Sequence, residues 1–128
     1  MNTSKSLDSE KAQKLNQLLE DMKREGNLPG ILFSYREGDL IAENIGIEFN
    51  REEFSSMCAS VLESAIGLNK TMSEKNMVQI IAELEKQTII LVECDEKTFL
   101  ALIMNEESKV NSILENIEKY IRKIIFLY

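Results

Sequence analysis

Apolar side chains recur at intervals of three and four residues in three long segments of the chain. In the first segment Leu15, Leu18, Leu19 and Met22 repeat in this way, and charged or amide residues lie between them. This spacing places the apolar side chains along one face of a helix. The pattern therefore predicts three amphipathic helices, over residues 9–25, 51–72 and 108–125. Each segment has a residue that can cap its first turn: Ser9, Asn50 and Ser108.

Shorter apolar runs of the strand type lie between these helices. The first two flank a turn in which Gly38 can supply the positive φ of a hairpin. The joints between the later runs are short and charged, so they permit only antiparallel connections. The predicted strands span residues 31–35, 40–45, 77–84, 88–93 and 98–104.

The predicted element order is α-β-β-α-β-β-β-α. We therefore expect an α+β fold in which a five-stranded antiparallel sheet is sandwiched between helices. The helix over residues 51–72 should cover one face of the sheet, and the other two helices should cover the opposite face. Residues 1–8 are expected to form a flexible N-terminus, and residues 9–128 a single domain.

Two stripes lie side by side on the helix predicted over residues 51–72. One is apolar and is predicted to face the core: Phe54, Met57, Cys58, Val61, Ala65, Leu68 and Met72, widened by Leu62 and Ile66. The other has small side chains: Ser56, Ser60, Ser64, Gly67 and Thr71. A small-residue stripe either lets a second helix backbone approach closely or simply faces solvent.

The apolar run at the C-terminus, residues 124–128, has two interpretations. We expect it to extend the packed face of the last helix. The alternative is that Phe126 and Tyr128 form an exposed contact patch.

Composition argues against catalysis. The 128 residues include no histidine, which excludes histidine-activated nucleophiles and histidine zinc sites. The two cysteines, Cys58 and Cys94, are predicted to be buried thiols, and neither a phosphate-binding glycine loop nor a nucleophile elbow occurs. We expect no enzyme activity, no cofactor and no metal.

The net charge of −7 bears on partners and location. It disfavours direct binding to nucleic acid and to anionic membranes. The first ten residues lack the apolar core of a signal peptide, and no apolar run approaches the length of a membrane span. We expect a cytoplasmic protein without membrane insertion.

The chain resembles the roadblock family of dynein light chains and small-GTPase regulators. The resemblance rests on Leu15-x-x-Leu18-Leu19, on Leu28-Pro29-Gly30 before the first strand, on the Arg36-Glu37-Gly38-Asp39 turn, and on Ala59-Ser60-Val61-Leu62. It extends over residues 9–125 through the element order. Longin domains share the later part of this order, and profilin is a more distant relative of the pattern.

This resemblance implies a non-catalytic binding platform that forms a homodimer and regulates or scaffolds a Ras-like small GTPase. The alternative is a structural adaptor subunit of a trafficking or motor-like complex that does not contact a GTPase. The implied dimer packs the small-residue stripe and pairs the strand over residues 77–84 with its copy, through Ser56, Ser60, Ser64, Gly67, Met77, Gln79 and Ile81. The implied partner-binding residues are Arg51, Glu52, Glu63 and Lys70. Arg51 is the best placed of the four arginines to act as an arginine finger, but we expect binding to hold the switch loops of the GTPase in place rather than to supply a finger.

Overall fold

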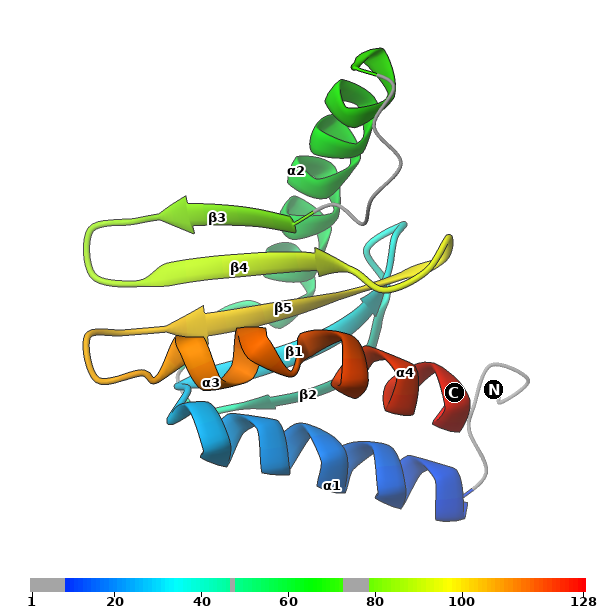
Figure 1. The fold of residues 1–128 in the computed structure, drawn as a ribbon, viewed down its shortest axis with the longest axis vertical. Coiled ribbons are helices and arrows are strands. Elements are labelled where there is room, and N and C mark those ends of the chain that lie inside the picture. Colours follow the sequence, from blue (N-terminus) through cyan, green and yellow to red (C-terminus); the bar gives the residue numbers. More distant parts are fainter. Residues whose placement is uncertain (1–8, 47, 73–78) are drawn as a thin grey trace.

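The structure is a computed structural model that describes residues 9–46, 48–72 and 79–128. Its helices and strands follow the predicted order as far as the last strand (Figure 1). They are α1 (Ser9–Gly26), β1 (Gly30–Tyr35), β2 (Leu40–Ile45), α2 (Arg51–Thr71), β3 (Gln79–Glu83), β4 (Thr88–Glu93), β5 (Thr98–Met104), α3 (Val110–Glu115) and α4 (Ile117–Leu127). The strand predicted over residues 77–84 is seen as β3, and residues 77 and 78 lie outside the described residues.

The five strands form one antiparallel sheet in the order β2-β1-β5-β4-β3. The central strand β5 is buried along its whole length, which explains why its sequence is apolar without alternation. The two ends of the sheet are β2 and β3. The predicted fold, with a five-stranded antiparallel sheet between helices, is confirmed.

Each face of the sheet has its own hydrophobic core. On one face α2 covers the sheet, and Leu62 of this helix packs with Leu32 and Phe99. On the other face α1, α3 and α4 form the covering layer (Figure 1). The predicted division of the helices between the two faces is therefore correct.

The turn between β1 and β2 is joined tightly to α2. Gly38 adopts a φ of 108°, as the hairpin pattern predicted. A Cβ at this position would also lie 3.1 Å from the Cα of Ser56 in α2. Nearby, the fully buried hydroxyl of Ser55 donates a 2.8 Å hydrogen bond to that of Ser34 in β1. These contacts set how the first half of α2 lies on the sheet.

The C-terminal helix predicted over residues 108–125 is in fact two helices. The break falls at Asn116, whose side-chain amide donates to the carbonyl of Ser112 at 3.0 Å. The predicted cap at Ser108 is wrong, because its hydroxyl donates instead to the carbonyl of Asn27 at 3.1 Å. This bond ties the loop after β5 to the end of α1. The predicted cap of α2 is correct, since Asn50 Oδ1 accepts from the backbone N–H of Glu53 at 3.0 Å.

Candidate interaction surface

The side of α2 that faces away from the sheet carries an outer apolar stripe, made of Met57, Val61, Leu68 and Met72. Met57 is 64% exposed, Leu68 67% and Met72 71%. The prediction that these four side chains face the core is therefore wrong. The face that packs on the sheet is made of Ser55, Cys58, Ala59, Leu62 and Ile66. The exposed and the packed residues both have helical spacing. The packed side is the one whose smaller residues allow the helix to lie close to the sheet.

The small-residue stripe of α2 lies beside the outer apolar stripe and is also exposed. All five of its members are exposed: Ser56, Ser60, Ser64, Gly67 and Thr71. The Ser60 hydroxyl bonds to the carbonyl of Ser56 within the helix, at 3.2 Å. A Cβ at Gly67 would meet none of the described atoms within 4 Å. Glycine inside a helix costs about 1 kcal/mol of stability relative to alanine. Packing within the described chain does not explain why glycine occupies this position.

The strand β3 forms an end of the sheet next to β4. Directly opposed residues of antiparallel strands point to the same face of the sheet. Ile80 pairs with Leu91, which belongs to the core on the α2 side, so Ile80 faces α2. Ile81 pairs with Ile90 of the other core and is 55% exposed. Gln79 shares the face of Ile81, so these two predicted interface residues do not share a face with the stripes of α2. Met77, the third predicted residue in this strand, lies outside the described residues.

Of the four predicted partner-binding residues, Glu52 and Lys70 are exposed on α2. Arg51 is engaged within the chain. Its guanidinium lies 2.9 Å from the carboxylate of Glu43, donates to the carbonyl of Ile45 at 3.2 Å, and stacks over the ring of Phe49. Arg51 would have to leave these contacts to reach another protein.

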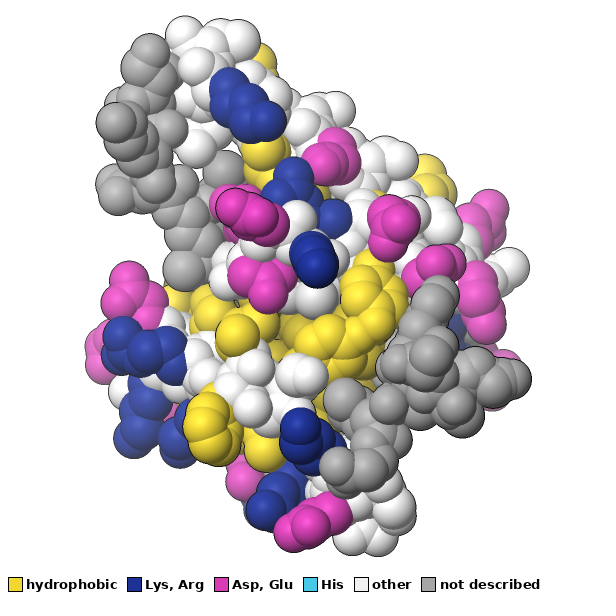
Figure 2. Space-filling view, turned by 90° about the vertical axis from the view of Figure 1, so that its right-hand side faces the viewer, with side chains coloured by type: hydrophobic (Ala, Val, Ile, Leu, Met, Phe, Trp, Pro, Cys, Tyr) yellow, Lys and Arg dark blue, Asp and Glu magenta, His cyan; other side chains and the backbone are white. Residues whose placement is uncertain are grey.

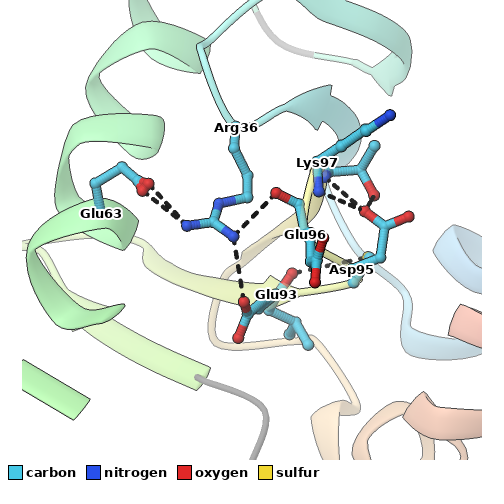
Figure 3. Close-up of polar contacts among 9 residues, drawn as sticks. Arg36, Glu63, Glu93, Asp95, Glu96 and Lys97 are labelled. Carbon is cyan, nitrogen blue, oxygen red and sulfur yellow. Dashed lines mark hydrogen bonds and ion pairs between the residues drawn. The ribbon is translucent and has the colours of Figure 1, made fainter. Parts of the chain in front are cut away.

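Glu63, the fourth predicted residue, belongs to a cluster centred on Arg36 (Figure 3). The Arg36 guanidinium, whose side chain is 19% exposed, binds both carboxylate oxygens of Glu63 at 2.8 and 2.9 Å. It also lies 3.4 Å from the Glu93 carboxylate and donates to the carbonyl of Glu96 at 3.0 Å. The cluster thus joins α2 to both hairpin turns at this end of the sheet. The sequence contains no signal for it, because α2 and the two turns meet only in the folded chain.

The titratable groups with shifted pKa values do not assemble into a catalytic site. Hydrogen bonds from Ser112 and Tyr120 lower the pKa of Glu25, and burial with the same Glu25 contact raises the pKa of Tyr120 to about 12. Burial raises the pKa of the Cys58 thiol to about 12 and also raises that of Cys94. Cys58 is buried as predicted, whereas Cys94 is only partly buried. These groups belong to helix contacts and to the sheet.

Within the described residues, no group of three histidine, cysteine or acidic side chains is placed to hold a metal ion. The helices that the structure describes include none that is both long enough and apolar enough to cross a membrane. The exposed stripes of α2 and the edge of β3, which no other described strand pairs, are therefore the first candidates for function.

Comparison with known proteins gives one family and several similar folds. The family model described as the Roadblock/LC7 domain matches residues 14–104. A structure of MglB with a tetrameric arrangement superposes with a TM-score of 0.82 at 16% identity, over 91% of this chain and 89% of that one. The gliding protein MglB from Thermus thermophilus gives 0.82 at 15% identity, over 91% and 90%. A Roadblock/LC7 domain from Streptomyces avermitilis gives 0.75 at 9% identity, over 85% and 92%. Curated proteins give no match.

Proposed function

Because the chain belongs to the Roadblock/LC7 family, we propose that it is a non-catalytic, dimeric binding platform that regulates or scaffolds a Ras-like small GTPase. The observation that carries this proposal is the exposure of four large apolar side chains on α2, close to a free sheet edge. A globular domain seldom leaves such a helix face uncovered unless it binds another protein there.

The proposed dimer brings together two copies of α2 and two copies of β3. An unpaired strand edge offers a row of backbone donors and acceptors, and pairing it with its copy would join two sheets into one of ten strands. The α2 helices of both copies would then lie on the same face of that sheet. Their outer apolar stripes would lose contact with water, and the missing side chain of Gly67 would allow the two backbones to come close.

Self-assembly is compatible with this fold, since one of the similar structures is MglB in a tetrameric arrangement. In the proposed dimer the side chains of Ile81 from the two copies would lie near the two-fold axis, on the face opposite α2. Pairing through the backbone of β3 does not require its exposed side chains to share a face with α2. Gln79 and Ile81 therefore stay in the proposed interface.

The proposed GTPase surface is the charged flank of α2. Glu52 and Lys70 are exposed there, and two copies side by side would present one composite platform. Glu63 lies on the same flank and is already paired with Arg36. A GTPase bound at this flank would have its switch loops stabilised by the chain. The chain would not supply an arginine, because Arg51 is engaged in contacts of its own.

The dimer is tested by light scattering at micromolar concentration. We expect twice the monomer mass for the wild-type chain. Ser60→Arg places a long charged side chain in the small-residue stripe and should weaken association, whereas Gln13→Arg, on the exposed face of α1, should leave it unchanged. A wild-type chain that is monomeric at these concentrations refutes the dimer.

The partner is tested by mixing the protein with each Ras-like GTPase of its source organism, loaded with GTP or with GDP. Lys70→Glu should reduce binding and Lys109→Glu, on a loop away from α2, should not. Lys70 is a better probe than Glu63, because a Glu63 variant would also disrupt the Arg36 cluster. If no GTPase binds in either state while a complex without a GTPase is recovered from cells, the chain is an adaptor subunit.

A further inference from the structure

A second surface feature lies on the opposite side of the molecule from α2. It is a groove of about 470 Å³ between α1 and α4. These two helices run antiparallel, side by side, over the other face of the sheet (Figure 1). The surface inside the groove is almost entirely apolar, with Leu18 and Leu127 among the residues that line it.

Phe126 lies in this groove and is 87% exposed, more than any other large apolar residue that the structure describes. The prediction that Phe126 extends the packed face of the last helix is therefore wrong. The buried face of α4 is formed by Ile117, Ile121 and Ile124, and Phe126 points away from it. Figure 2, which views the end of the molecule where α4 finishes, shows hydrophobic side chains at the surface, with both basic and acidic side chains around them.

The rim of the groove is positively charged on a protein that is acidic overall. Lys14, Arg122 and Lys123 line it, against a net charge of −7 for the chain. Among the described residues, no ion pair involves Arg122 or Lys123. The one acidic residue of the rim, Asp21, already accepts a 2.9 Å hydrogen bond from Gln17 and lies 3.8 Å from Arg24. Lys14 is likewise paired, with Glu10 at 3.3 Å, so the charge available to a ligand is the positive charge of Arg122 and Lys123.

We propose that this groove binds an amphipathic helix with acidic flanks from a partner protein. A shallow channel between two antiparallel helices is complementary to the ridges of a third helix. The apolar stripe of the ligand would cover Phe126 and Leu127, and its carboxylates would pair with Arg122 and Lys123. Because α2 lies on the other face of the sheet, this site stays open in the proposed dimer and does not depend on it.

Two other occupants fit the groove less well. A second copy of the chain bound symmetrically would bring the same cations together, and like charges in contact oppose binding. An anionic membrane is attracted by the cations, but it is repelled by the net charge of −7 and cannot fill a concave channel. An acidic helix satisfies both the shape and the charge.

The test uses the full chain labelled with ¹⁵N and a designed helical peptide of about 14 residues, roughly 21 Å long. The peptide carries Leu at positions i, i+3, i+4 and i+7, and Glu on both flanks. A matched peptide carries Lys in place of each Glu. We expect the acidic peptide to shift amide signals of α1 and α4 but not those of α2, and to bind at least about tenfold more tightly than the basic one.

Three variants locate the site. Phe126→Ser should weaken binding of the acidic peptide about tenfold, because it removes a large apolar contact from the groove. The double variant Arg122→Glu, Lys123→Glu should reverse the preference, so that the basic peptide binds more tightly. Lys109→Glu, outside the groove, is the control and should change neither affinity. All four positions are exposed, so circular dichroism should show that each variant is folded.

Several results would overturn the proposal. Equal affinity for the two peptides would refute the role of charge, and no binding of either would refute the helix-binding site. Sedimentation with phosphatidylserine vesicles that is lost in Phe126→Ser would identify a membrane site instead. A change in oligomeric state in Phe126→Ser would identify a contact between copies. A dimer that fails to form, with the acidic peptide still bound in the groove, would refute the proposed function alone.

Discussion

Substitution of Gly67 by alanine distinguishes a solvent-facing α2 from one that packs against a second copy. Gly67 lies inside α2, and a Cβ at this position would meet none of the described atoms within 4 Å. In a monomer, Gly67→Ala should therefore stabilise the fold by about 0.5–1 kcal/mol, because alanine restricts the unfolded chain and favours the helix. For a domain of this size that corresponds to a rise of about 2–4 °C in melting temperature.

The sign changes if a second α2 backbone packs at Gly67. The added methyl group would then overpack a close helix contact, at a cost of about 1–3 kcal/mol in the dimer. Because dimer formation depends on concentration, the effect of Gly67→Ala on stability should change from favourable in dilute solution to unfavourable in concentrated solution.

The assay is urea unfolding of wild-type and Gly67→Ala chains at low and at high micromolar concentration, with dimer dissociation constants from sedimentation. Both chains are also measured in the Ser60→Arg background, where the alanine should be stabilising at every concentration. A Gly67→Ala chain that is equally stabilised at both concentrations, with an unchanged dissociation constant, would refute the placement of Gly67 in the interface.

Three further predictions follow from single contacts. Gly38→Ala should destabilise the fold by about 1–3 kcal/mol in urea unfolding, since the residue has a φ of 108° and lies against the backbone of Ser56; an unchanged midpoint would contradict the close approach of hairpin and helix. The pKa of Glu25 is lowered by its bonds to Ser112 and Tyr120, so its stabilising effect is complete above the unfolded pKa of about 4.5 and is lost as the pH falls through the lower folded pKa. Glu25→Gln should therefore make the fall in stability below about pH 5 less steep, and identical acid profiles would argue against these bonds. Calorimetry with GTP and GDP at millimolar concentration should show no binding, because the start of α2 is acidic and its capping site is filled by Asn50; a micromolar affinity for either nucleotide would contradict this.

Much of the fold could be predicted from local features of the sequence. The alternation between strand-type runs and helical spacing, with short charged joints, is sufficient to give an antiparallel sheet covered on both faces. Gly38 marks the first hairpin because only glycine adopts its φ readily, and Asn50 marks the start of α2 because its side chain binds an N–H of the first turn. Each of these choices depends on neighbours in sequence, so it is visible without the tertiary structure.

The orientation of α2 was decided only by tertiary packing. Its sequence holds one broad apolar stripe at helical spacing, and periodicity alone cannot say which side of this stripe meets the sheet. Contact with β1 and β5 selects the stripe of Cys58 and Leu62, and so exposes Met57 and Leu68. The candidate surface of the protein is therefore one part of the stripe that the spacing assigned to the core.

The groove and the Arg36 cluster have the same origin. Arg36 meets Glu63 and Glu93 only because α2 crosses the sheet beside both hairpin turns, across separations in sequence that no local pattern records. The groove forms where α4, after the break at Asn116, lies beside α1, a contact between the two ends of the chain. The sequence by itself determined which segments are helices and strands, since that depends on local spacing and turns. The tertiary structure decided which of their faces remain exposed, because burial depends on what each face meets across the fold.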